Sequence, residues 1–128
     1  MSKRILLCDD EIHILRAMEF KLKKGGYDVE ITTDGEEAWE AIQNRKPDLL
    51  ITDCQMPRLS GLELINRLRN NPQTAAIAVF MLTAKGYELS QELLFDQLRV
   101  LRVIAKPFSP RELLREVDAV TQQETVIV

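Results

Sequence analysis

Polar side chains follow four short apolar runs of the sequence, and their types suit the binding of metal ions and phosphoryl groups. The runs and the residues after them are Ile5–Cys8 before Asp9 and Asp10, Leu49–Thr52 before Asp53, Ala78–Leu82 before Thr83, and Val103–Ala105 before Lys106. Carboxylate oxygens are ligands that a hard cation such as Mg²⁺ prefers. A hydroxyl and an ammonium can hold the oxygens of a phosphoryl group. The sequence therefore indicates a site for a divalent cation and a transferable phosphoryl group.

The three carboxylates divide between metal binding and nucleophilic attack. Magnesium usually takes one or two carboxylates and completes its shell with water and phosphate oxygens. We therefore expect Asp10 and Asp53 as direct ligands and Asp9 as a ligand through water. Asp53 stands alone at the end of its run, which makes it the best candidate nucleophile toward phosphorus. Thr83 and Lys106 would each hold one equatorial oxygen during transfer.

The elements that must position these residues are strands and helices in regular alternation. Short runs rich in β-branched residues and leucine, separated by helical segments, indicate buried parallel strands. The segment Asp28–Thr32 alternates polar and apolar residues and suits a sheet edge. We predict an α/β fold, a doubly wound five-stranded parallel sheet of flavodoxin-like order 2-1-3-4-5 with five helices. This order puts the reversal point, where ligands bind, between the strands that precede Asp9 and Asp53.

Caps and apolar spacing define the expected helices. The first should end at Lys23-Lys24-Gly25-Gly26, where basic residues suit the helix dipole and glycine suits a left-handed cap. Ser60 with Glu63, and Ser109 with Glu112, have the spacing of a capping box. The fourth helix should run from about Glu88 to Arg99. The predicted inward residues are Ile14, Leu15, Met18 and Leu22, then Ala38, Trp39 and Ile42, then Leu94 and Leu98, and finally Leu113, Leu114, Val117 and Val120.

Composition narrows the class of protein. A chain of 128 residues has the length of one domain, and its net charge of −3, from 17 basic and 20 acidic residues, argues against non-specific nucleic-acid binding. It contains no apolar stretch long enough for a membrane span, so we expect a cytoplasmic protein without membrane contact. The two cysteines, Cys8 and Cys54, form no disulfide framework, and small buried thiols are favoured over a redox role for Cys54.

At these residues the chain resembles the receiver domains of two-component response regulators, with a likeness to the chemotaxis regulators. The matching elements are Cys8-Asp9-Asp10-Glu11, then Asp53-Cys54-Gln55-Met56-Pro57 with Gly61, then Thr83-Ala84, and last Lys106-Pro107-Phe108. Each element alone is common. Together they are specific, because they occur in order and each follows a strand, and they cover nearly the whole chain.

The resemblance implies a phosphorelay function. A sensor histidine kinase or histidine phosphotransfer protein would donate a phosphoryl group to Asp53, with Mg²⁺ as cofactor and the backbone carbonyl of Gln55 as a further metal ligand. The Lys106–Pro107 bond would be cis. Such a receiver is no enzyme beyond promoting its own phosphotransfer and autodephosphorylation, and Gln55 and Lys85 would tune the lifetime of the phosphoryl group. The face of the fourth helix, last strand and last helix would switch toward an unknown protein target, or toward a homodimer on activation.

Other functions stay open at this point. A degenerate receiver could act as an unphosphorylated scaffold, although the intact set of site residues argues against this. A flavodoxin-like flavin-binding module would want a hydroxyl- and glycine-rich loop after the first strand, where Asp9, Asp10 and Glu11 would repel a phosphate. His13, the only histidine, is a surface residue rather than a phosphoacceptor in our interpretation.

The chain departs from the family on the last strand. Receivers usually carry an aromatic residue three positions before the site lysine, and here that position is Val103. Because valine is short and stiff at χ1, we expect the switch to depend on the loop after Thr83. Residues 1–121 are assigned to the receiver domain and residues 122–128 to a C-terminal tail or linker stub.

Overall fold

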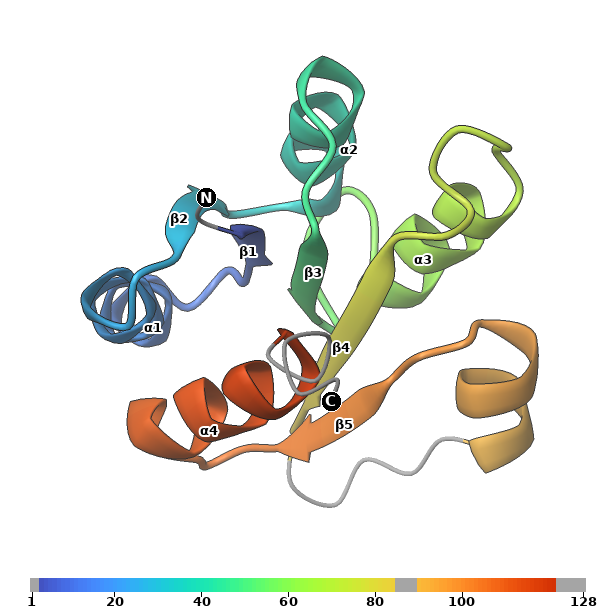
Figure 1. The fold of residues 1–128 in the computed structure, drawn as a ribbon. Coiled ribbons are helices and arrows are strands. Elements are labelled where there is room, and N and C mark those ends of the chain that lie inside the picture. The colour runs from blue at the N-terminus through green and yellow to red at the C-terminus, as the bar shows by residue number, and fades with distance from the viewer. Residues whose placement is uncertain (1–2, 85–89, 122–128) are drawn as a thin grey trace, which may run out of the picture.

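Five strands and five helices alternate along the chain of this computed structural model, which describes residues 3–84 and 90–121 (Figure 1). The strands are β1 (Arg4–Cys8), β2 (Asp28–Thr32), β3 (Leu49–Asp53), β4 (Ala78–Thr83) and β5 (Arg102–Ala105). The helices are α1 (Ile12–Lys24), α2 (Gly35–Asn44), α3 (Gly61–Arg69), η1 (Glu92–Gln97) and α4 (Pro110–Thr121). The predicted alternation of elements is therefore confirmed. None of the described helices is long and apolar enough to cross a membrane.

All neighbouring strands are parallel, and their order is β2-β1-β3-β4-β5. The predicted order is confirmed, with the polar strand β2 at one edge of the sheet. Cys8 lies beside Thr32 on one side and Thr52 on the other, so β1 and β3 end at the same level. Asp9 and Asp53 consequently lie side by side at the point where the strand order reverses.

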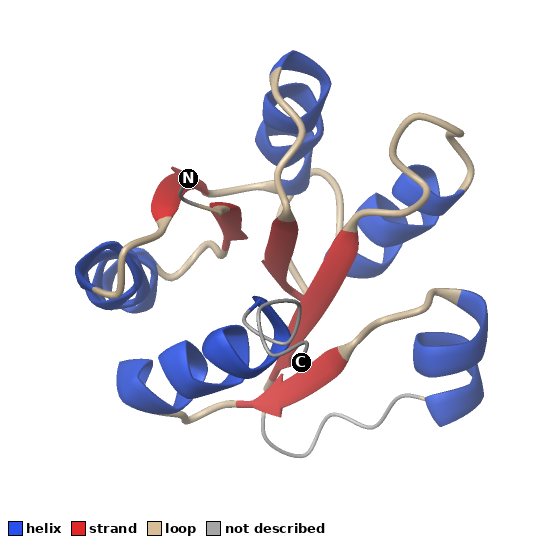
Figure 2. Cartoon of the chain, viewed as in Figure 1, coloured by secondary structure: helices blue, strands red, loops and turns tan. Residues whose placement is uncertain are grey.

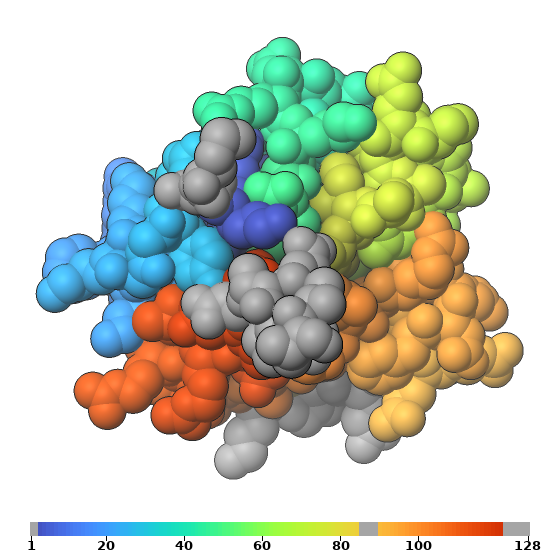
Figure 3. Space-filling model, in the orientation of Figure 1, coloured from blue at the N-terminus to red at the C-terminus, as the bar shows by residue number. Residues whose placement is uncertain are grey.

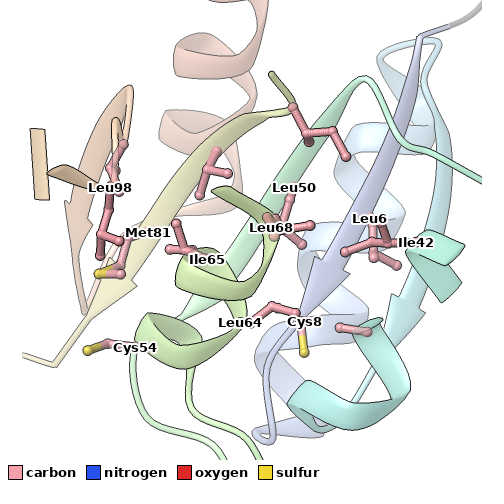
Figure 4. Close-up of a cluster of buried hydrophobic side chains, with 14 of the residues drawn as sticks. Leu6, Cys8, Ile42, Leu50, Cys54, Leu64, Ile65, Leu68, Met81 and Leu98 are labelled. Carbon is pink, nitrogen blue, oxygen red and sulfur yellow. The ribbon is translucent and has the colours of Figure 1, made fainter. Parts of the chain in front are cut away.

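Helices cover both sides of the sheet (Figure 2). Because successive residues of a strand point to opposite faces, Leu6 and Cys8 enter one core cluster while Ile5 and Leu7 enter the other. The first cluster lies under α2, α3 and η1, and Figure 4 shows Leu50 and Leu68 within it between Leu6 on one side and Met81 on the other. The second cluster lies under α1 and α4.

The helices α1 and α4 also contact each other directly. The hydroxyl of Tyr27, just after α1, donates to Asp118 of α4 at 2.6 Å. In the space-filling view the blue N-terminal segments lie against the orange-red residues of α4 (Figure 3). The predicted inward residues Leu15, Met18, Leu113 and Val117 are buried, and Leu114 and Val120 pack against the same cluster while only partly buried.

The helix ends follow the expected capping chemistry. Ser60 and Glu63 form a reciprocal capping box at α3, and the same exchange joins Ser109 and Glu112 at α4. At the end of α1 the left-handed conformation belongs to Gly26, with φ of 98°, whereas Gly25 stays right-handed. The Tyr27 N–H then reaches back to the Leu22 carbonyl and closes the helix.

The fourth helix differs from its prediction. Residues Glu92–Gln97 form a short π-helix, in which the Leu98 N–H donates to the Leu93 carbonyl at 2.8 Å, while Glu88 lies outside the described residues. The predicted burial of Leu94 and Leu98 is confirmed. The half-buried Arg69 guanidinium ties the end of this helix to the segment before β4. Its acceptors are the carbonyls of Leu98 and Arg99 after the helix and those of Ala75 and Ile77 before β4, at 2.6–3.2 Å.

Candidate functional site

A pocket of about 170 Å³ opens at the carboxyl ends of the central strands. Its lining residues are Glu11, Asp53, Cys54, Gln55, Ala84 and Lys106. They come from the loops after β1, β3, β4 and β5, which are distant in the sequence. The pocket lies where the strand order predicts a ligand site.

Three carboxylates gather at this pocket. Asp9, Asp10 and Asp53 each offer an oxygen, and these oxygens lie within 4.8 Å of one another. Asp9 is fully buried, Asp53 is nearly so, and Asp10 is exposed. One oxygen of Asp9 accepts a hydrogen bond from the Glu11 backbone N–H at 2.9 Å, which fixes the orientation of that carboxylate. Three oxygen donors this close suit a hard divalent cation.

The Lys106 ammonium sits against the same carboxylates. Its Nζ lies 2.9 Å from Asp9 Oδ2, 3.3 Å from Asp53 Oδ1 and 2.6 Å from Glu11 Oε1. The Lys106 N–H donates to the Thr83 carbonyl at 2.7 Å, which joins the loops after β4 and β5. The Lys106–Pro107 peptide bond is cis, as predicted.

Burial and mutual repulsion shift the protonation of the acids. Burial raises the pKa of Asp53 to about 6, and the charge of Asp9 adds to this effect while Lys106 opposes it. Burial also raises the pKa of Asp9, against the hydrogen bond from Glu11 and the charge of Lys106. Burial alone would lower the pKa of Lys106, but contacts with Glu11, Asp9 and Asp53 raise it above its usual value. The ammonium is therefore charged at any physiological pH.

The other predicted site residues lie around this cluster. Thr83 is the buried last residue of β4, beside Ala105 of β5, and Gln55 is exposed on the loop after β3. Lys85 lies outside the described residues. Val103 is 36% exposed on β5, so the position that usually carries an aromatic residue faces outward here. His13 is exposed on α1.

The two cysteines are packed structural residues. Both are free and buried, and burial raises the pKa of Cys8 to about 12. The Cys8 thiol donates to the Asp34 carbonyl at 3.3 Å and lies 3.1 Å from the Met56 sulfur. A Cys8 thiol that stays protonated is a poor nucleophile and metal ligand, and the burial of both cysteines agrees with the small buried thiols expected from the sequence.

Glu11 makes the shortest contact to Lys106, a role that was not predicted from the sequence. The available signal was its position directly after the acidic pair, at the start of a helix. That position also suits a residue that merely favours the helix dipole, so the contact was not predictable from residue type.

The strand order, the acidic cluster and the lysine together define a doubly wound α/β protein with three carboxylates and an ammonium gathered at its switch point. The family model of the response regulator receiver domain matches residues 5–118. The chain therefore belongs to the response regulator receiver domain family. This assignment confirms the resemblance seen in the sequence and speaks against a flavin-binding module.

Two curated relatives illustrate the relationship. The alkaline phosphatase synthesis transcriptional regulatory protein PhoP of Bacillus subtilis is 37% identical over 98% of this chain and 51% of the relative. The phosphate regulon transcriptional regulatory protein PhoB of Pseudomonas aeruginosa is 37% identical over 96% of this chain and 53% of the relative. The chain thus spans about half the length of the curated relatives it matches.

Solved structures share the whole fold. A putative response regulator from Chloroflexus aurantiacus superposes with a TM-score of 0.83 at 32% identity, over 94% of this chain and 98% of the other. The chemotaxis response regulator CheY4 of Vibrio cholerae gives a TM-score of 0.84 at 28% identity, over 94% and 99% of the two chains.

Proposed function

We propose that this receiver accepts a phosphoryl group on Asp53 from a histidine kinase or a histidine phosphotransfer protein, with Mg²⁺ as cofactor. The observation that carries the proposal is the position of Asp53, which leaves the central strand β3 beside Asp9 and 3.3 Å from the Lys106 ammonium. At this distance the ammonium can hold a phosphoryl oxygen while the Asp53 carboxylate attacks phosphorus.

In the proposed transfer, an Asp53 carboxylate oxygen forms a bond to phosphorus as the bond from phosphorus to the donor imidazole nitrogen breaks. The imidazole takes the electron pair of the broken bond and leaves. Lys106 would hold one equatorial oxygen through its ammonium, and Thr83, at the end of β4, would hold another through its hydroxyl. The pKa of about 6 leaves Asp53 largely ionised at neutral pH, as a nucleophile must be.

The donor set fits Mg²⁺. Asp10 and Asp53 would bind it directly, the Gln55 backbone carbonyl would add a neutral oxygen, and Asp9 would act through water. Asp10 is exposed and so can keep the ion partly hydrated, as Mg²⁺ prefers. When bound, the ion would offset the negative charge that develops on the phosphoryl oxygens.

The output would pass from Thr83 to the face formed by η1, β5 and α4, either to a protein target or to a homodimer on activation. Because Val103 points outward, we propose that the loop after Thr83 carries most of the change. We assign residues 1–121 to this cytoplasmic receiver domain and do not expect it to contact nucleic acid or membrane itself. Residues 122–128 lie outside the described residues.

An unphosphorylated scaffold is the competing function. A scaffold has no use for several carboxylates gathered around an ammonium. Holding like charges together destabilises the fold, so this arrangement costs stability without serving a scaffold. The close approach of Asp9, Asp53 and Lys106 therefore favours phosphorylation.

Incubation with acetyl phosphate and magnesium tests the proposal. Intact-mass spectrometry should show one added phosphoryl group on the wild-type protein and none on Asp53→Ala. If the protein is a scaffold, neither the wild type nor Asp53→Ala should gain a phosphoryl group. An adduct that persists on Asp53→Ala would move the acceptor elsewhere.

A further inference from the structure

The Lys106 ammonium already has three carboxylate neighbours. An ammonium carries three N–H donors, and Asp9, Glu11 and Asp53 each offer one oxygen within 3.3 Å of the nitrogen. Of these three contacts, the one to Glu11 at 2.6 Å is a hydrogen bond and the other two are ion pairs, so a phosphoryl oxygen arriving at Asp53 competes with Glu11 for this ammonium.

The three partners differ in their freedom to leave. Asp9 is fully buried, and its other oxygen is held by the Glu11 backbone N–H at 2.9 Å. Asp53 is only 11% exposed and would itself carry the phosphoryl group. The Glu11 side chain is 56% exposed, so water can solvate its carboxylate as soon as it leaves the lysine. Glu11 is thus the partner that can be released at the lowest cost.

The helix makes no use of the Glu11 side chain. Glu11 occupies the N-cap position of α1 in an extended conformation, yet its side chain makes no capping hydrogen bond. Its carboxylate instead reaches 95 residues along the chain to Lys106 at 2.6 Å. A purely structural capping role does not explain this orientation.

We propose that Glu11 is a positioning residue that holds Lys106 in the unphosphorylated protein and must release it for the lysine to bind the phosphoryl group. The inference rests on the proposed function and deepens it. Glu11 competes with the phosphoryl group for the same ammonium, and so it lowers the affinity of the site for phosphoryl-like ligands.

Titration with beryllofluoride in magnesium, followed by ¹⁹F NMR, tests this role. Glu11→Gln should bind beryllofluoride about two- to fivefold more tightly than the wild type, a range set by the strength of a partly exposed ion pair. Glu40→Gln, which removes an exposed carboxylate from α2, is the matched control and should bind like the wild type.

Glu11→Asp separates the contact from the charge. It keeps the negative charge but is one methylene shorter, so it cannot preserve the 2.6 Å contact. Release of Lys106 predicts tighter binding for Glu11→Asp, as for Glu11→Gln. Wild-type affinity in Glu11→Asp would mean that charge alone matters and would overturn the inference.

The remaining outcomes are also decisive. Unchanged or weaker binding by Glu11→Gln, with normal binding by the wild type, would overturn the role of Glu11 and leave the proposed function intact. Failure of the wild type to bind beryllofluoride would overturn the proposed function and this inference together.

Discussion

Asp53 lies between Asp9, which repels its negative charge, and Lys106, which attracts it. Its pKa depends on these two neighbours and on its burial. Burial and the charge of Asp9 raise its pKa to about 6, although Lys106 lies 3.3 Å away. The ionised form of this carboxylate is consequently less stable in the folded protein than in the unfolded chain. A carboxylate held in this way is stabilised when a cation binds beside it.

This shift predicts a pH-dependent gain in stability for Asp53→Asn. The carboxyl has a pKa of 3.8 as a reference and about 6 in the folded protein, so the folded state binds the extra proton between these values. Folding stability therefore falls as pH rises through this window. Without metal, Asp53→Asn should be more stable than the wild type by about 1–3 kcal/mol at pH 7.5.

Denaturant unfolding in EDTA at several pH values measures the effect. The advantage of Asp53→Asn should shrink below pH 6 and vanish only below about pH 3, where the carboxyl is protonated in both the folded and the unfolded state. Glu40→Gln serves as the control and should show no such trend. A constant advantage at all pH values would contradict the assigned cause.

At the residue scale, types and strand ends were enough to predict the cluster of Asp9, Asp10 and Asp53, because parallel strands bring their carboxyl ends together. The Glu11 contact was not predictable, since it depends on the side-chain conformation of an exposed residue. The outward position of Val103 was likewise settled only by the burial pattern of β5.

At the element scale, the start of α2 supports the loop that carries Gln55. Asp34 caps α2 and also pairs with Arg58 at 3.3 Å, while the Cys8 thiol links the Asp34 carbonyl to the Met56 sulfur. Arg58 adopts a left-handed conformation with φ of 70°, so the loop is held in a shape that an arginine rarely takes. The loop that carries the proposed metal ligand Gln55 is thus docked on α2 rather than free.

Gly35 is the tightest point of this docking. A Cβ added there would lie 2.1 Å from the Leu59 carbonyl oxygen, so Gly35→Ala must push the loop away from α2. We expect a loss of about 1–3 kcal/mol in unfolding free energy and a weaker affinity for magnesium. Denaturant unfolding and a magnesium titration measure both effects.

Gly25→Ala is the matched control for Gly35→Ala. Its added Cβ would lie 2.7 Å from Leu114 Cδ1, the end of a flexible side chain that can turn aside. This variant should lose less stability and keep its magnesium affinity. If the two variants bind magnesium equally well, the docking of the loop on α2 does not matter for the site.

The π-helix marks the limit of prediction from sequence at this scale. Apolar spacing predicted the burial of Leu94 and Leu98 correctly, because either helix type places them toward the sheet. The hydrogen-bond pattern could not be predicted, since apolar spacing does not separate an α-helix from a π-helix and the contact of Arg69 with the Leu98 carbonyl comes from a separate helix. A contact with a residue from another helix cannot be seen in the spacing of apolar residues within this segment.

At the scale of the whole molecule, the strand order positions the site. Placing β1 beside β3 brings Asp9 and Asp53 together, and placing β5 beside β4 lets Lys106 reach across from the edge. This topology was predictable because the polar strand β2 could be tolerated only at an edge. This arrangement also brings three carboxylates close enough to repel one another, and a bound cation would reduce that repulsion.

Magnesium should therefore stabilise the whole fold. A ligand that binds only the folded state adds about 2.7 kcal/mol at a hundredfold excess over its Kd. Thermal melting with and without magnesium should show a clear rise in Tm, and Asp10→Asn should blunt it, because Asp10 is exposed and contributes to the cluster rather than to the core. Identical melting curves in EDTA and in saturating magnesium would refute the metal site.

The most direct test of the central claim is to locate the phosphoryl group chemically. Borohydride reduces an aspartyl phosphate to homoserine, so protein treated with acetyl phosphate and magnesium, then reduced and digested, reports the acceptor by peptide mass spectrometry. We predict homoserine at position 53 and aspartate retained at positions 9 and 10, with no conversion when EDTA replaces magnesium. Conversion at Asp9 or Asp10, or an unmodified Asp53 under phosphorylating conditions, would contradict the assignment of Asp53 as the phosphoacceptor.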